Sequence, residues 1–313
     1  MGSKAYFVCL ANVFWNIQAN SDNLAGDGLP LSFWAAVYNA FASPYLSPSN
    51  VTASCPSGNC TFDTYYSLGL CALPAVNLTH QIIATPNIQG VDCSISANAL
   101  SYPNLPNCTY ELPNGVMLDA DDCTLNVTSA LDYGNGSTNS IAYPESLNGI
   151  PIDFFVVYIS HNTGLIVAME YALCFCGQTY NSSVTGGQTL TTIISTWNTI
   201  KRVTSGSYGE LWGFVVIEGP VVFNISEYVI SNMMDASQEI FQGMVVPVSG
   251  DFFQTISQSD TGVSISAQAI GTVFTQAGNE SAAMDVFMNN LAISLTNRFV
   301  TPIKSIPSLA PHN

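Results

Sequence analysis

The sequence predicts an α+β fold: a mostly antiparallel β-sheet core with a few helices and a disulfide-stapled N-terminal half. Two observations favour this fold. Strand-like segments come first and helical ones later, without the regular alternation of βαβ units. Residues 50–148 are rich in Cys, Asn and Pro, whereas residues 149–300 contain long β-branched and aromatic runs.

Four segments after residue 150 carry the strand pattern. PIDFFVVYIS, GLIVAMEYALCFCGQTYN, GQTLTTIISTWNTI and LWGFVVIEGPVVFNIS are apolar or β-branched and are bounded by Gly, Asn and Pro. We expect them to form the central strands of an antiparallel sheet. A fifth segment, TISQSDTGVSISAQAI, alternates like a further strand or pair of strands.

Helical spacing is visible in three places. Residues 29–43 place apolar side chains at helical intervals before Pro44. Residues 226–241 and 281–299 are expected helices, with Ser226 and Ser281 as N-caps. The apolar face of the last helix comprises Met284, Phe287, Leu291 and Leu295.

The cysteine-rich half contains a hairpin signal. In NCTYELPNGVMLDADDC, a Pro-Asn-Gly turn separates two alternating segments. Cys108 and Cys123 are placed to clamp the open end of this hairpin.

The charge balance excludes two classes of partner. Five basic residues stand against 21 acidic ones, giving a formal net charge of −16. Nucleic-acid binding needs Lys and Arg to neutralise phosphates, and anionic membranes need the same residues. Only 8% of the residues are charged, so something other than charge must keep the surface hydrated.

Glycosylation would supply that hydration. Asn-x-Ser/Thr triplets without Pro in the middle position occur nine times. The predicted acceptors, and thus the predicted covalent N-linked glycan partners, are at Asn50, Asn59, Asn77, Asn107, Asn126, Asn135, Asn181, Asn224 and Asn279. Asn59 and Asn107 have Cys in the middle position and rank lower as acceptors.

The nine cysteines indicate an oxidising compartment. Without Cys9 in the leader, eight remain, enough for four bridges in 105 possible pairings. The predicted disulfide cysteines are Cys55, Cys60, Cys71, Cys93, Cys108, Cys123, Cys174 and Cys176. Cys174 and Cys176 are two residues apart on a predicted strand, where side chains face the same side, so they suit two separate bridges.

Three sections organise the chain. Residues 1–20 resemble an apolar leader, either a weak signal peptide or the stump of a membrane segment, too short to span a bilayer. Residues 21–300 are expected to form one composite extracellular domain, Cys- and sequon-rich over 50–148 and strand- and helix-rich over 149–300. Residues 301–313 form a Pro-rich tail. No membrane span is predicted in this chain.

The segment CPSGNCTFDTYYSLGLC, residues 55–71, resembles the signature of a large fungal family of membrane proteins of unassigned function. The family's ectodomain carries a Cys-Pro-x-Gly-Asn-Cys-Thr-Phe motif and a Ser-Leu-x-x-Cys ending. CTYELPNG, EYALCFCGQTYNSSV and LAISLTNRF follow in the family's order, so the resemblance covers roughly residues 50–300. It implies an extracellular location and a membrane-anchored relative, but no activity.

Two departures from the family's pattern stand out. The family often has Cys where this chain has Pro74, and tends to have Cys where this chain has Tyr171. The absence of both cysteines fits the loss of a single disulfide that would join these two positions in relatives. Disulfide mapping in a relative that carries both cysteines would test this.

Candidate catalytic and metal-binding residues are few, and the prediction is no catalytic site, no metal and no cofactor. Asp260-Thr261-Gly262 lacks the second such loop of an aspartic protease, and no Gly-x-Ser-x-Gly elbow accompanies the histidines. Asp119, Asp121, Asp122 and Asn126 lack the spacing of a calcium loop. The three histidines are His80, His161 and His312, and the acids in or near apolar strands are Asp153, Glu170, Glu210 and Glu218.

The sequence therefore predicts a non-catalytic glycoprotein domain that is secreted or displayed on the cell surface, with binding, adhesion or sensing of an unknown protein or carbohydrate ligand as its function. Two alternatives stay open. One is a secreted glycoside hydrolase using Glu170 and a second carboxylate, which an open groove with two carboxylates about 5–10 Å apart would favour. The other is a self-assembling extracellular coat protein, a homo-oligomer.

Overall fold

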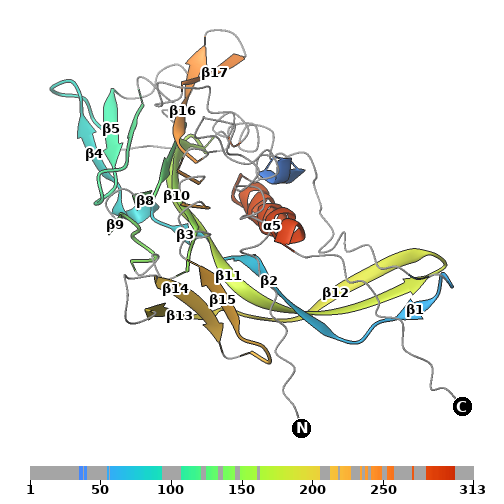
Figure 1. Cartoon of the computed structure of the whole chain (residues 1–313). Coiled ribbons are helices and arrows are strands. Elements are labelled where there is room, and N and C mark those ends of the chain that lie inside the picture. Colours follow the sequence, from blue (N-terminus) through green and yellow to red (C-terminus); the bar gives the residue numbers. More distant parts are fainter. Residues whose placement is uncertain are drawn as a thin grey trace, which may run out of the picture.

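The computed structural model describes 17 separate stretches of the chain. They are residues 35–37, 39–40, 55, 57–93, 107–120, 125–132, 137–144, 149–160, 163–204, 212–217, 219–226, 233–234, 237–238, 241–248, 252–256, 270 and 280–299. Within them the protein is mostly antiparallel β-sheet with few helices, as predicted (Figure 1).

A nine-stranded sheet forms the centre of the molecule. Its longest member is β11 (Ile166–Thr185), and every pairing in the sheet is antiparallel. β10 (Ile152–Ile159) and β12 (Gln188–Trp197) pair with successive parts of β11. The other members are β1 (Cys60–Thr61), β2 (Tyr65–Ala72), β3 (Val76–Asn77), β7 (Leu125–Ser129), β16 (Gly243–Val248) and β17 (Phe252–Ile256).

Three smaller sheets accompany the central one. The first contains β4 (Ile83–Pro86), β5 (Cys108–Glu111) and β6 (Met117–Asp119), and the second contains β8 (Leu131–Asp132) and β9 (Ser137–Thr138). The third contains β13 (Thr199–Thr204), β14 (Trp212–Ile217) and β15 (Phe223–Ser226). The 3-10 helix η1 spans Thr79–Gln81.

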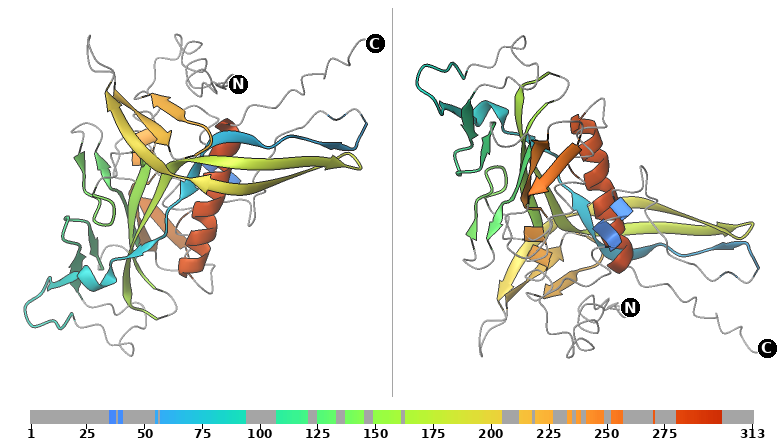
Figure 2. Two further views of the ribbon diagram at one scale, coloured as in Figure 1. Left: turned by 90° about the horizontal axis from the view of Figure 1, so that it is seen from below. Right: turned by 90° about the horizontal axis from the view of Figure 1, so that it is seen from above.

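Strand β10 is buried on both faces, which explains its unbroken apolar run. Phe154, Val156 and Tyr158 belong to one hydrophobic core, beneath helix α5 (Glu280–Phe299). Phe155 and Val157 alternate with them and belong to a second core, beneath β4, β5 and β6. Helix α5 and this small sheet lie on opposite sides of β10 (Figure 2).

Helix α5 packs through the predicted apolar face, and Met284, Phe287, Leu291 and Leu295 are at most 2% exposed. One polar contact fixes its end: the Thr296 hydroxyl accepts from the backbone N–H of Leu70 at 2.8 Å and donates to the Leu70 carbonyl at 3.3 Å. Glu280 is the first helical residue, so Ser281 lies inside the helix rather than at its N-cap.

The predicted hairpin is present as β5 and β6, which pair antiparallel around a turn with Gly115 at φ 85°. The proposed Cys108–Cys123 clamp is wrong, because Cys108 bonds to Cys93. This bridge ties the hairpin to the end of the preceding segment instead. Cys123 lies outside the described residues.

Other element predictions meet mixed outcomes. The strands predicted to begin at residues 151 and 164 are β10 and β11. The segment predicted from residue 187 contains β12 and β13, and the segment from residue 211 contains β14 and β15. Residues 35–37 and 39–40 are helical as expected, and so are 233–234 and 237–238. Ser226 is the last residue of β15, and residues 227–232, where the predicted helix would begin, lie outside the described part. The strand predicted from Thr255 overlaps the end of β17, and its residues 257–269 lie outside the described part.

The distal halves of β11 and β12 extend away from the two cores as a two-stranded arm, with β1 along one side (Figure 2). At the base of this arm, the Trp197 indole lies against two glycines. A Cβ on Gly177 or on Gly219 would lie 2.1 Å from the Trp197 ring. Trp197 also stacks on Phe223, so it connects the arm to β15.

We predict that Gly177→Ala destabilises the fold by about 1–3 kcal/mol, because the new methyl overlaps the indole and forces Trp197 from its contacts. Urea unfolding would measure this loss. Thr189→Ala, at an exposed position of β12, is the matched control and should change stability little. Equal stability of Gly177→Ala and the parent would contradict the prediction.

Candidate functional site: a buried acid pair beside a thiol and a disulfide

Two acids lie within the central sheet, where β10 and β11 pair. Glu170 on β11 lies opposite Phe155, and Asp153 on β10 lies opposite Ala172. The two acids are therefore diagonal neighbours on one face of the sheet. Both residues are fully buried, at 0% exposure. Ionised carboxylates are costly in such a place unless they are partnered.

Glu170 has its partners in the loop that follows β9. The Ser140 hydroxyl donates to Glu170 Oε1 at 2.5 Å, and the backbone N–H of Ala142 donates to Oε2 at 2.8 Å. The backbone N–H of Tyr143 donates to Ser140 Oγ at 2.8 Å, and the Tyr143 hydroxyl donates to the Pro74 carbonyl at 2.6 Å. Glu170 thus holds this loop against β3 and β11.

Asp153 differs from Glu170, because neither of its carboxyl oxygens has a partner at hydrogen-bonding geometry among the described residues. Burial first, and the nearby Glu170 charge second, raise the pKa of Asp153 well above its ordinary value of 3.8. Burial also raises the pKa of Glu170, against the opposing effect of its hydrogen bonds. Burial thus favours the protonated form of Asp153 more strongly than that of Glu170.

A thiol and a phenol border the acid pair. Cys174 follows Glu170 by four residues on β11 and so faces the same side of the sheet. Asn198 Nδ2 donates to its sulfur at 3.8 Å, and burial raises the pKa of the thiol. Burial first, then the Glu170, Asp153 and Cys174 charges, raise the pKa of Tyr143 to about 12.

Cys174 is a free, buried cysteine, so its predicted bridge is wrong. Cys176, two residues further on, bonds to Cys71 of β2 across 105 residues of sequence. The register nevertheless places Cys174, not Cys176, directly opposite Cys71. Cys71 therefore bonds to its diagonal neighbour, and the cysteine facing it keeps its thiol.

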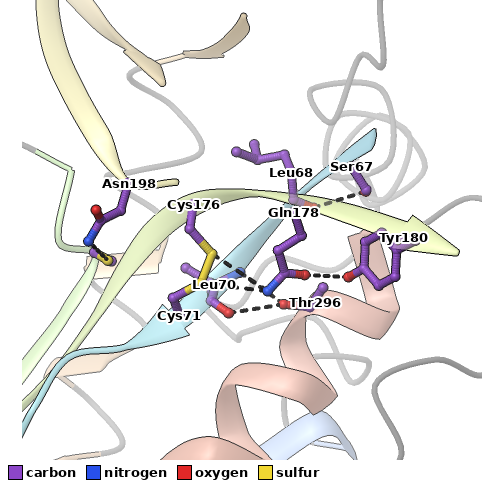
Figure 3. The surroundings of a disulfide bond; sticks show 10 residues. Ser67, Leu68, Leu70, Cys71, Cys176, Gln178, Tyr180, Asn198 and Thr296 are labelled. Atoms are coloured by element: carbon purple, nitrogen blue, oxygen red, sulfur yellow. Dashed lines mark hydrogen bonds between the residues drawn. A yellow bond between two sulfur atoms is a disulfide. The ribbon is translucent and has the colours of Figure 1, made fainter. Parts of the chain in front are cut away.

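Gln178 and Tyr180 surround the Cys71–Cys176 bridge (Figure 3). Gln178 Nε2 lies 3.6 Å from each sulfur, and its Oε1 accepts from the Tyr180 hydroxyl. Thr296 of α5 reaches the same place through Leu70. This polar group within the sheet joins β2, β11 and α5.

The CPSGNC motif has a structural role at the tip of the arm. Cys55 bonds to Cys60, and the small loop they close lies against the β11–β12 turn. The backbone N–H of Gly187 donates to the Gly58 carbonyl at 2.9 Å, and that of Gly186 donates to Asn59 Oδ1 at 3.0 Å. Gly58 adopts φ 71°, a left-handed conformation that suits glycine. The motif thus caps the end of the arm.

The predicted sugar acceptors differ in exposure. Asn59, Asn77 and Asn181 are exposed, and Asn107 is half-buried. Asn126 is only 9% exposed, because β7 is an inner strand of the sheet, and its Nδ2 donates to the Met117 carbonyl at 2.5 Å, both of which count against an acceptor at this position. The Asn224 side chain, and all of Asn50, Asn135 and Asn279, lie outside the described part.

The remaining candidates are scattered. Asp119 Oδ1 accepts from Asn87 Nδ2 at 3.2 Å in the small sheet, and the exposed His80 lies in η1. Across the described stretches, no group of His, Cys, Asp and Glu has the arrangement of a metal site, and no helix is both long and apolar enough to cross a membrane. The candidates outside the described residues are Cys9, Asp121, Asp122, His161, Glu210, Glu218, Asp260, Thr261, Gly262 and His312.

Sequence reasoning identified Asp153 and Glu170 but missed the residues that surround them. Ser140, Tyr143 and Asn198 lie in or beside loops with no motif, so only the fold brings them to the acids and the thiol. Through its hydrogen bonds to Ser140 and Ala142, Glu170 holds the loop that follows β9. Both oxygens of Glu170 already accept hydrogen bonds, so the role of this acid in the structure is to position that loop.

Comparisons with protein-family models, curated proteins and solved structures returned no match to this chain. The residues themselves therefore carry the functional argument.

The acid pair predicts a pH dependence of stability. The folded-state pKa of Asp153 is raised, so the folded protein keeps a proton that the unfolded chain loses above about pH 4. Stability is therefore fully present below the unfolded pKa and falls as pH rises toward the folded pKa. Asp153→Asn is neutral at every pH, so this decline should shrink.

Urea unfolding of the parent and Asp153→Asn from pH 4 to pH 9 would measure the difference in slope. Asp63→Asn, at an exposed position, is the control and should follow the parent. A decline in Asp153→Asn as steep as in the parent would contradict a protonated Asp153.

The register also predicts an alternative bridge. In Cys176→Ala, Cys71 should bond to Cys174, which already faces it and closes a loop of nearly equal length. Cys71→Ala, the matched variant, leaves neither bridge available and should lose the whole contribution of the disulfide, about 5 kcal/mol by loop entropy. Peptide mapping without reduction would identify the bridge, and guanidinium unfolding would rank the variants. Free Cys71 in folded Cys176→Ala would refute the prediction.

Proposed function

We propose that the chain is the extracellular, disulfide-bonded and N-glycosylated domain of a fungal cell-surface or secreted protein, and that it acts by binding rather than catalysis. The Cys71–Cys176 bridge carries this proposal. It joins two neighbouring strands in the middle of the central sheet, with Cys176 fully buried, and spans 105 residues of sequence. Disulfides persist in oxidising compartments and are rare in the cytosol.

The other bridges and the surface agree with that compartment. Cys55–Cys60 and Cys93–Cys108 join cysteines that are 5 and 15 residues apart in the sequence. Three exposed sequon asparagines offer attachment points for sugar on a chain with only 8% charged residues. The fungal origin and the cell-surface setting rest on the resemblance of the CPSGNC segment alone.

Binding is favoured over hydrolysis because of the state of Glu170. A glycosidase acid must reach the scissile oxygen of its substrate. The Glu170 carboxyl is fully buried, and its two oxygens accept from Ser140 and Ala142.

Secretion from a eukaryotic host tests the proposal. We expect peptide mapping to find the three bridges and a free Cys174 in the secreted protein, and glycopeptide analysis to find sugar on at least one of Asn59, Asn77 and Asn181. Asn126 serves as the internal control and should stay unmodified because it is buried. Reduced Cys71 and Cys176 together with unmodified asparagines throughout would overturn the extracellular assignment.

A further inference from the structure

The arm has an unusual surface for an exposed pair of strands. Residues 177–197 contain no Asp, Glu, Lys, Arg or His. β12 pairs with β11 on one side, and its other edge has no partner strand among the described residues. Open edges are normally protected by charged side chains, by Pro or by a bulge. Residues 188–193, the distal part of β12, have none of these, since the register shift lies nearer the base.

Apolar side chains add to the exposure. Leu190 is 65% exposed and Ile194 is 57% exposed. They belong to the segment TLTTII, which combines high β-propensity with no charge and no Pro. Such a segment on an open edge favours pairing with a second copy of itself. Natural proteins usually cover or interrupt such an edge.

The sequence places a sugar acceptor in the middle of this surface. Asn181 of β11 lies directly opposite Thr192 of β12, and Ser183, which completes the sequon, lies directly opposite Leu190. Residues that face each other in an antiparallel pair project from the same face of the sheet. Asn181 and Thr192 are exposed, whereas Ser182 and Thr191 on the other face are buried and bonded to each other at 2.8 Å.

We propose that an N-linked glycan on Asn181 covers the exposed face of the arm and keeps the protein from associating through β12. The acceptor faces Thr192, with Leu190 two positions away along the strand on one side and Ile194, the exposed, unpaired residue at the register shift, two positions away on the other. A strand rises about 3.4 Å per residue, so both lie within about 7 Å of Thr192 along β12. A bulky, hydrated oligosaccharide on Asn181 shields both side chains and obstructs the approach of another strand.

This inference rests on the proposed function, since it requires passage through the secretory pathway. In this protein, the sugar would protect an open strand edge, as charged side chains do in other proteins. The inference also predicts that the sequons differ in their effect on association. Sugar at Asn181 controls association, whereas sugar at Asn77, on β3 near Glu170, does not.

The experiment compares secreted parent protein with Asn181→Gln and Ser183→Ala, two variants that remove the same sugar by different changes. Asn77→Gln removes a sugar away from the arm and is the matched control. Glycopeptide analysis measures occupancy, and size-exclusion chromatography with light scattering measures mass over a range of concentrations. We expect the parent and Asn77→Gln to be monomeric, and both Asn181 sequon variants to associate at concentrations at least tenfold lower.

A rescue variant separates association through the arm from general misfolding. Asn181→Gln combined with Leu190→Thr and Ile194→Thr should be monomeric again, because the apolar side chains are gone. Occupied Asn77 with unoccupied Asn181, monomeric Asn181→Gln, or a parent that already associates through β12 would overturn this inference alone. Absence of sugar from every asparagine would overturn the proposed function as well.

Discussion

The structure depends on the pairing of one strand, β11, along both edges. Twenty residues of this strand contact β10 and then β12 on one side, and β3, β2 and β1 on the other. Segments separated by more than 100 residues thus meet on one strand. The Cys71–Cys176 bridge joins β2 to β11, which pair over eight residues. Because the sheet takes strands from both halves of the chain, neither half supplies the core by itself.

Burial of both faces at β10 and β11 explains the chemistry of the acid pair. Asp153 and Glu170 occupy strand positions whose neighbours are core residues, so the fold must partner or neutralise them. Glu170 is partnered by the Ser140–Tyr143 loop, and burial raises the pKa of Asp153, which favours its neutral form. The hydrogen bonds that compensate for the burial of Glu170 also attach the Ser140–Tyr143 loop, which has no secondary structure of its own, to the sheet.

The register of β11 also sets which residues between β2 and β3 lie opposite it. Leu73 donates its backbone N–H to Ala172, so continuing this pairing by one residue brings Pro74 and Tyr171 across from each other. Pro74 and Tyr171 are therefore neighbours across the two strands. At the far end of β11, the Cys55–Cys60 loop lies against the β11–β12 turn and caps the tip of the arm.

The sequence by itself determined the strand-rich class, the long strands after residue 150, the hairpin around Gly115 and the apolar face of α5, because periodicity and turn residues are local properties. It also identified Asp153 and Glu170 as acids in apolar strands. Only the tertiary structure decided that Cys71 bonds to Cys176 while Cys174 keeps its thiol, that Asn126 is buried, and that Ser140 reaches Glu170. These facts follow from register and from which strand lies inside the sheet, and both are set by contacts between residues distant in sequence.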